Sequence, residues 1–425
     1  MSNLQKFIRS NPIPIRILIF IALFSLCSQF MLSQDTVENN TNNILQEIDL
    51  SYPLKVCWKL ENEKFLNKTV ASDKNNYFYV AGGIIKSLNS ETGEKRWETD
   101  LGGEIISTPY TDGENVYVVS KLKEEQNEEL TFNDVSTNYD VSTNYNEKNI
   151  IVRSLNTSSG VTIWQTNLKT DVNPEQIFLY IYKSTLLIVD ENGNLYSICR
   201  DNGIFKWRKR LGAKLSALPY FYADKAVLGT FEKQLLIFNL SENETYIKIK
   251  KVKLDTIPTA ISLTNDEETL IIGDQIGIVS TIKVEKTDYG ISKKKKKEKN
   301  DSWEFRLGGA VSNISVTPKG LLITSLDNFA YLISEKKGNL IWRKRLAGRI
   351  SDKLLVLDNY ALITTIARPI ISVVELSAGK LINEIILEGE DFVTANPIKT
   401  QYKIIVPSSK GLYAFSSKDC HKIEK

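Results

Sequence analysis

Apolar runs of strand length, separated by turns rich in Gly, Asn, Asp and Ser, follow one another from about residue 54 to residue 415. One set of four is clearest between Gly309 and Leu346, at residues 311–318, 320–325, 329–333 and 340–343. Short β-rich runs at even spacing, bounded by turn residues, are the signature of four-stranded blades. The pattern predicts an all-β protein built from repeated blades.

A nine-residue phrase ends most of these units: a Gly, a Trp four residues later and a Leu four residues after the Trp. Complete copies are Gly93-Trp97-Leu101, Gly160-Trp164-Leu168, Gly203-Trp207-Leu211 and Gly338-Trp342-Leu346. Partial copies bring the aligned Trp positions to 58, 97, 164, 207, 250, 303, 342 and 383, with Lys250 and Asn383 in place of Trp. A period near 40 residues predicts an array of eight small β units.

The first aligned strand, Val56-Cys57-Trp58, has no strands before it, whereas the strands at residues 398–406 and 411–415 have no fourth strand after them. Pairing of this first strand with the strand at residues 411–415 completes one four-stranded blade and leaves no gap in the ring. We therefore predict an eight-bladed β-propeller of four-stranded antiparallel blades, closed by the N-terminal strand. It should span residues 54–418, after a polar linker at 35–53 and before a tail at 419–425.

Cys57 and Cys420 lie near opposite ends of this propeller, where a disulfide would lock the ring. If Tyr331 faces Trp342 across its hairpin, the same register puts Ala414 opposite Cys57 and leaves Cys420 six residues further on. At about 3.3 Å per strand residue that separation is too long for a disulfide. The register thus predicts that the two cysteines are not bonded.

Residues 1–34 are typical of a signal peptide or an N-terminal anchor, because Lys6, Arg9 and Arg16 precede the apolar run 17–32. Either interpretation places the propeller outside the cytosol. Cys27 is the residue that a lipid would modify in a bacterial lipoprotein. Leu26 is larger than the small residue expected before such a cysteine, and the alternative is that Cys27 is discarded with the signal peptide.

Charge and histidine content narrow the function. The 54 Lys and Arg nearly balance the 51 Asp and Glu, so no global basic field indicates a nucleic-acid partner. The one histidine, His421, lies in the tail and cannot build an acid–base or metal site within the ring. We predict no catalytic residue, no cofactor and no bound metal.

Two segments depart from the period. Residues 124–148 contain the duplicated hexapeptide Asp-Val-Ser-Thr-Asn-Tyr and are expected to form a surface loop between the second and third strands of a blade. Residues 286–301 include the run Lys293–Lys297, inserted in a hairpin. Such a run is usually solvated, and the alternative is attraction to an anionic lipid or lipopolysaccharide surface.

Residues 88–97, which read Leu-Asn-Ser-Glu-Thr-Gly-Glu-Lys-Arg-Trp, and residues 193–198 followed by Gly203 and Trp207, resemble the repeat of PQQ-like (quinoprotein dehydrogenase-like) β-propellers. The resemblance covers nearly all of residues 54–415. It implies that a Trp of each blade docks against the neighbouring blade, the positions being Trp58, Trp97, Trp164, Trp207, Trp303 and Trp342.

The resemblance leaves two main functions open. One branch of the family holds pyrroloquinoline quinone and Ca²⁺ in a central funnel with a catalytic Asp, often beside paired cysteines that this chain lacks. The other branch consists of exported, non-catalytic scaffolds that assist outer-membrane β-barrel assembly. We favour the non-catalytic scaffold, in the periplasm or at the outer membrane of a Gram-negative-type bacterium. A quinoprotein dehydrogenase, or an exported sensor or ligand-binding propeller, is the alternative.

In the scaffold branch, loops of adjacent blades contact the barrel-forming partner. The stretches Leu215-Ser216-Ala217-Leu218-Pro219 and Asp255-Thr256-Ile257-Pro258 occupy similar places here, although the match is partial. The resemblance therefore implies partner contacts for Leu215, Leu218 and Asp255, with ordinary packing of first strands as the alternative. It also implies a protein partner, in an outer-membrane barrel assembly complex, and membrane association through a lipid or the N-terminal anchor.

Overall fold

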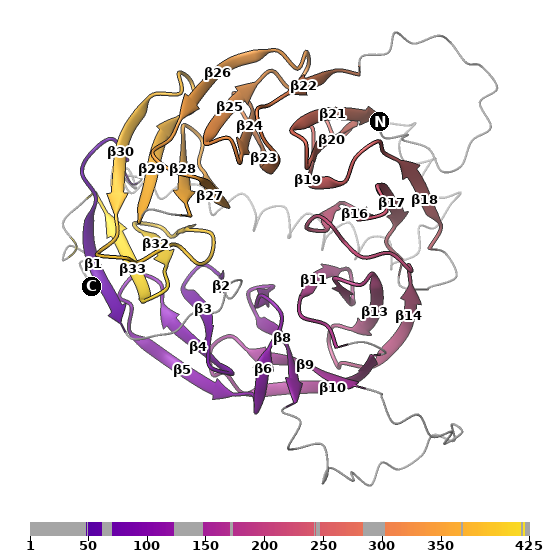
Figure 1. Ribbon diagram of the computed structural model, residues 1–425. Coiled ribbons are helices and arrows are strands. Elements are labelled where there is room, and N and C mark those ends of the chain that lie inside the picture. Colours follow the sequence, from indigo (N-terminus) through magenta and orange to yellow (C-terminus); the bar gives the residue numbers. More distant parts are fainter. Residues whose placement is uncertain are drawn as a thin grey trace, which may run out of the picture. The chain divides into compact units, whose positions relative to one another are not determined.

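Eight antiparallel sheets follow one another around a ring in the computed structural model (Figure 1). The structure describes residues 48, 50–61, 70–122, 148–170, 173–241, 243, 247–283, 302–366, 369–417 and 420. All of them belong to one compact unit, Ile48–Lys425. The described residues form strands and turns, and they contain no helix that is long and apolar enough to cross a membrane. The predicted all-β, eight-bladed propeller is confirmed.

We number the blades along the chain, and blade 8 combines both chain ends. Listed within each blade from the axis outward, apart from the extra inner strand β7 of blade 2, the strands are: blade 1, β2 (Val70–Ser72), β3 (Asn76–Ala81), β4 (Ile84–Asn89), β5 (Lys95–Asp100); blade 2, β6 (Gly103–Ile105), β7 (Tyr110–Thr111), β8 (Asn115–Leu122), β9 (Lys148–Asn156), β10 (Thr162–Thr170); blade 3, β11 (Ile177–Tyr182), β12 (Thr185–Asp190), β13 (Asn194–Cys199), β14 (Phe205–Arg210); blade 4, β15 (Tyr220–Tyr222), β16 (Lys225–Thr230), β17 (Gln234–Asn239), β18 (Ile249–Lys253); blade 5, β19 (Pro258–Leu263), β20 (Thr269–Asp274), β21 (Ile278–Lys283), β22 (Glu304–Arg306); blade 6, β23 (Val311–Thr317), β24 (Gly320–Ser325), β25 (Phe329–Ile333), β26 (Leu340–Arg345); blade 7, β27 (Ile350–Val356), β28 (Tyr360–Thr365), β29 (Ile370–Glu375), β30 (Leu381–Ile386); blade 8, β31 (Ile398–Lys399), β32 (Ile404–Pro407), β33 (Gly411–Ser416), β1 (Lys55–Glu61).

The core lies between successive blades. Second strands such as β12 and β24 are buried at every position, because both of their faces pack on a neighbouring sheet. In outer strands such as β26, exposed residues alternate with buried or half-buried ones from the Trp onward. A continuous apolar run therefore becomes a middle strand, and an alternating run that ends in charged residues becomes an outer strand.

The Gly and Trp of the repeated phrase act across blade boundaries. The indole N–H of Trp97 in blade 1 donates to the carbonyl of Thr157 in blade 2 at 2.8 Å. Its ring covers Gly160 so closely that a Cβ on that glycine would lie within 3.0 Å of the indole. Each glycine thus receives the Trp of the preceding blade. The same geometry joins Trp58 to Gly93, Trp164 to Gly203, Trp303 to Gly338 and Trp342 to Gly379.

A β-bulge precedes the Trp in most outer strands, and it corrects the predicted register. Trp342 pairs with Leu332, and the pairing shifts between this pair and the next one, Leu340 with Ile333. Tyr331 pairs with Arg343, so the expectation that it faces Trp342 was wrong. Because a bulge adds one residue to a single strand, every pairing beyond it is displaced by one. Equivalent shifts occur in β1, β5, β10, β14 and β30.

Closure begins at the boundary of blades 7 and 8, where Asn383 replaces Trp. Its side-chain amide donates to the carbonyls of Tyr52 at 2.7 Å and Leu50 at 3.3 Å. These carbonyls belong to the segment that leads into β1, and Leu50 and Ile48 are buried in the core shared by blades 7 and 8. Since no hairpin precedes β1, there is no turn glycine to receive an indole, and an amide takes its place.

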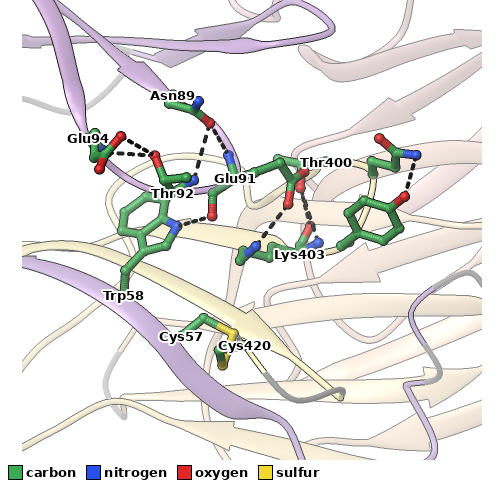
Figure 2. Close-up of polar contacts among 11 residues, drawn as sticks. Cys57, Trp58, Asn89, Glu91, Thr92, Glu94, Thr400, Lys403 and Cys420 are labelled. Atoms are coloured by element: carbon green, nitrogen blue, oxygen red, sulfur yellow. Dashed lines mark hydrogen bonds and ion pairs between the residues drawn. A yellow bond between two sulfur atoms is a disulfide. The ribbon is translucent and has the colours of Figure 1, made fainter. Parts of the chain in front are cut away.

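Cys57 and Cys420 form a disulfide with 5.1 Å between their Cα atoms, so the prediction that they are not bonded was wrong (Figure 2). The prediction extended the strand direction of β33 to Cys420, but β33 ends at Ser416. Cys57 also lies at the bulge between Val56 and Trp58, outside the regular pairing with β33. The bond ties the two chain ends together within blade 8.

The boundary of blades 8 and 1 carries an ion pair beside the Trp58 contact. Lys403 Nζ lies 2.9 Å from Glu91 Oε2, and the side chain of Lys403 is only 4% exposed. The carbonyl of the same Glu91 accepts the indole N–H of Trp58 at 3.1 Å. Figure 2 shows both contacts converging on Glu91. One turn of blade 1 is thus held by two residues of blade 8.

The two predicted insertions lie largely outside the described residues. Their flanking strands are β8 and β9 for residues 124–148, and β21 and β22 for residues 286–301. Each pair of strands is hydrogen-bonded within one blade, at the places expected from the period.

The docking of Trp on glycine predicts that alanine substitution lowers stability by different amounts at two glycines with the same backbone conformation. Gly160 and Gly102 have φ values of 70° and 68°, but nothing lies within 4 Å of a Cβ on Gly102. We expect Gly102→Ala to cost about 1 kcal/mol of unfolding free energy for its left-handed backbone. Gly160→Ala should cost about 1–3 kcal/mol more, since its methyl group overpacks Trp97. Equal denaturant midpoints for the two variants would contradict the docking geometry.

The disulfide predicts a large loss of stability on its removal. It closes a loop with a sequence separation of 363 residues. Cys57→Ser combined with Cys420→Ser should lower the unfolding free energy by on the order of 5 kcal/mol in the chain-entropy model. Cys199→Ser is the control, because Cys199 is not disulfide-bonded. Unfolding by urea that is insensitive to the double substitution would show that the bond does not constrain the ring.

Candidate functional site

The innermost strands surround a cavity of about 830 Å³ at the axis of the ring. Blades 1, 2, 3, 4, 6, 7 and 8 all contribute residues to its lining, mostly from β2, β7, β11, β15, β23, β27 and β31. A cavity formed by so many blades is the central channel of the propeller. Concave, partly apolar sites of this size are where propellers and other scaffolds hold ligands or partner segments.

One side of the channel is aromatic. Tyr180 of β11 stacks on Phe221 of β15, with ring centroids 4.3 Å apart and planes 10° from parallel. Tyr110, Phe178 and Tyr220 line the same cavity. Burial raises the pKa of Tyr180 and of Tyr220 above the usual value, so both phenols are neutral at pH 7. This side therefore offers uncharged, flat surfaces with a few hydroxyl groups.

The facing side is polar. Asp352 Oδ1 pairs with Lys353 Nζ at 3.0 Å, and the amide of Asn313 donates to the backbone carbonyl of Asp352 at 3.3 Å. Asn396 also lines the cavity. The two opposite charges largely neutralise each other. The channel is suited to holding a chain segment or small ligand by stacking and hydrogen bonds.

The channel does not fit the quinone and Ca²⁺ of the dehydrogenase branch. Ca²⁺ takes six to eight oxygen ligands, commonly from several carboxylates. Of the carboxylates along the axis, Asp352 is paired with Lys353, and Glu191 accepts the backbone amides of Glu175 and Gln176. The described residues contain no group of three or more His, Cys, Asp or Glu that could hold a metal. We therefore derive no step through a quinone.

The three predicted contact residues have different surroundings. Leu215 is buried, and its amide donates to the carbonyl of Glu191 at 2.8 Å. Leu218 is 62% exposed at the rim of the channel. Asp255 is exposed and lines a separate cavity of about 600 Å³ beside Asp274. The structure thus brings Leu218, but not Asp255, to the channel.

The aromatic lining was not identified from the sequence. β11 reads IFLYIY and β15 reads YFY, which resemble ordinary core strands. The signal was the position of these aromatic residues in the first strand of a blade, because first strands face the axis. Cys27 and the rest of residues 1–34 lie outside the described residues.

Comparison with known families adds to this geometry. A family model described as the outer membrane protein assembly factor BamB matches residues 55–138 and 148–288, which is more than half of the chain. The chain belongs to the BamB family. Among curated proteins, none matches the chain significantly. The BamB family is a family of PQQ-like propellers, in agreement with the resemblance noted in the repeat.

Two solved structures share the fold. The crystal structure of BamB from Moraxella catarrhalis has a TM-score of 0.57 and 11% sequence identity, and the match covers 88% of this chain and 100% of that one. The computationally designed protein Ika8 has a TM-score of 0.61 and 11% identity, covering 85% and 99% of the two chains. At this identity both matches bear on the fold alone, because unrelated functions share propeller architecture.

Proposed function

We propose that this chain is a non-catalytic scaffold that binds protein partners during outer-membrane β-barrel assembly, in the manner of its family. The observation that carries the proposal is the match of the BamB family model to more than half of the chain. The lining of the channel supports it, because the carboxylate that lines the channel, Asp352, is paired with Lys353. The partner in this proposal is a component of an outer-membrane barrel assembly complex.

The disulfide supports a location outside the cytosol. Structural disulfides form and persist in oxidising compartments such as the bacterial periplasm. Cys57 and Cys420 form such a bond, and Cys57 lies beyond the predicted signal or anchor at residues 1–34. In this proposal the propeller is periplasmic and is attached to a membrane through Cys27 or through the retained apolar segment.

The contact surface in this proposal is the channel rim around Leu218. The tyrosines beside the exposed Leu218 are of a type enriched at protein interfaces, where a few residues carry most of the binding energy. Leu218 is exposed, Pro219 beside it is half-buried, and both line the channel together with Tyr220 and Phe221. Asp255, in its separate cavity, would be a secondary contact, whereas the buried Leu215 would support the loop.

A second candidate function is the binding of a small exported ligand within the channel, and the stacked pair Tyr180 and Phe221 favours it. Such a ligand would bind the purified protein without a partner. Quenching of tyrosine fluorescence by periplasmic extract from which protein has been removed would support this function over scaffolding.

Leu218→Asp should reduce recovery of the barrel assembly complex from detergent-solubilised membranes at least tenfold, since loss of a hot spot costs about 2 kcal/mol. Ile386→Asp is the matched control. Ile386 is 66% exposed, against 62% for Leu218, but it lies on the outer strand β30. Failure of the parent chain to recover any barrel assembly component would reject the proposed function. Equal recovery with both variants would reject only the assignment to Leu218.

A further inference from the structure

Basic residues concentrate on the outer strands of two neighbouring blades. β14 reads FKWRKR and β18 reads IKKVK, so seven of their eleven residues are Lys or Arg and none is acidic. The whole chain, in contrast, has 54 basic and 51 acidic residues. The two strands follow each other on the outer rim (Figure 1), because blades 3 and 4 pack through one shared core.

The rim is not basic all the way round. β5 reads KRWETD and is balanced, and β30 reads LINEII and has a single charge, Glu384. β26 has three further basic residues, but β22, which separates it from β18, reads EFR and is neutral. The positive charge is therefore densest on the side formed by blades 3 and 4.

Part of this charge is used within the blade. Lys206 donates to the hydroxyl of Thr185 at 2.9 Å, and the guanidinium of Arg208 lies 5.1 Å from the ring centroid of Tyr196. Five basic side chains on or beside these strands are exposed, and one of them, Lys253, also lines the cavity of Asp255 and Asp274. We call the exposed set the basic rim: Arg210, Lys248, Lys250, Lys251 and Lys253.

Exposed apolar side chains lie on the outer wall of blade 3, which also carries Arg210, and of the neighbouring blade 2. Ile204 and Phe205, at the start of β14, are 63% and 48% exposed. In the preceding blade 2, Val161, just before β10, and Ile163, within β10, are 64% and 50% exposed. Cations mixed with protruding apolar residues are typical of surfaces that lie at the boundary of lipid headgroups and acyl chains.

The type of cation favours a diffuse anionic surface over a single shaped site. Four of the five residues of the basic rim are lysines, whose ammonium groups are compact point charges without the planar fork of arginine. A layer of phosphate headgroups complements such charges in many orientations. Each cation near an anionic membrane surface strengthens binding by roughly fivefold, so several together give measurable attachment.

We propose that the basic rim binds the anionic phospholipid headgroups of a bilayer, with Ile204 and Phe205 entering the headgroup layer. The ring then stands with its outer wall, rather than a face of the propeller, against the membrane. This contact is separate from the N-terminal attachment and from the channel rim, and so it goes beyond the proposed scaffold function.

Cosedimentation with vesicles tests the proposal. The full chain is mixed with vesicles of phosphatidylcholine alone or of phosphatidylcholine containing phosphatidylglycerol, at low and high salt. We expect preferential binding to the anionic vesicles that weakens with salt. Lys248→Glu combined with Lys251→Glu and Lys253→Glu should weaken that binding by roughly 100-fold or more, from about fivefold for each cation.

The control triple variant is Lys55→Glu, Lys95→Glu and Arg96→Glu. It changes net charge equally, but its residues lie on β1 and β5 of blades 8 and 1. The control should bind like the parent chain. Because both variants keep residues 1–47, N-terminal binding cancels in the comparison. Equal binding by all three proteins, or equal loss in both variants, would overturn the proposal.

Two further measurements complete the test. Replacing the same three lysines of the basic rim with Gln should weaken binding in the same direction, and thermal unfolding checks that each variant is folded. Binding of polyglutamate, with no preference for anionic vesicles, would overturn the lipid assignment and indicate an acidic protein partner instead.

Discussion

An indole that packs directly on a glycine of the next blade is the contact that joins the blades at five boundaries of the ring. At these boundaries the contact requires a large flat side chain at one fixed place in the outer strand and no side chain at one place in the next turn. Both residues lie in the same nine-residue phrase of a blade. Its Trp packs on the following blade, and its Gly accepts the Trp of the preceding blade. A typical blade therefore packs its Trp on the following blade and accepts the Trp of the preceding blade at its turn glycine.

This contact cannot form between blades 7 and 8, because the outer strand of blade 8 is β1, which no hairpin turn with a glycine precedes. Asn383 instead donates to backbone carbonyls of the entering segment at residues 50 and 52. The next boundary combines Trp58, the buried pair of Lys403 with Glu91, and the nearby disulfide. The strongest chemical constraints of the molecule thus gather where the chain ends meet. A ring of sheets opens most readily there, since only non-covalent contacts otherwise hold the first strand.

The spacing of the repeat was sufficient to predict the blade count, the strand order and the closing strand. These follow from period and alternation, which are properties of sequence. The register was off by one residue, because the bulge before the Trp, at Ile341 for example, leaves no compositional signal. The disulfide looked too long to form for a different reason, because the strand direction of β33 was extended to Cys420 although β33 ends at Ser416. The channel was missed for another reason: Tyr180 and Phe221 read like core residues and do pack on the core of blades 3 and 4, but they also line the channel.

The Gly and Trp of the repeat hold the blades together. The proposed binding surfaces are elsewhere, at the channel rim for a protein partner and on the outer wall for lipid. The central claim is a ring closed covalently by Cys57 and Cys420, and the thiols of the protein in its native cells test it most directly. Free thiols are alkylated before lysis, and the peptides are mapped without reduction. The account predicts a linked peptide pair that contains Cys57 and Cys420, with Cys199 alkylated. Alkylated Cys57 and Cys420 in the native protein would contradict it.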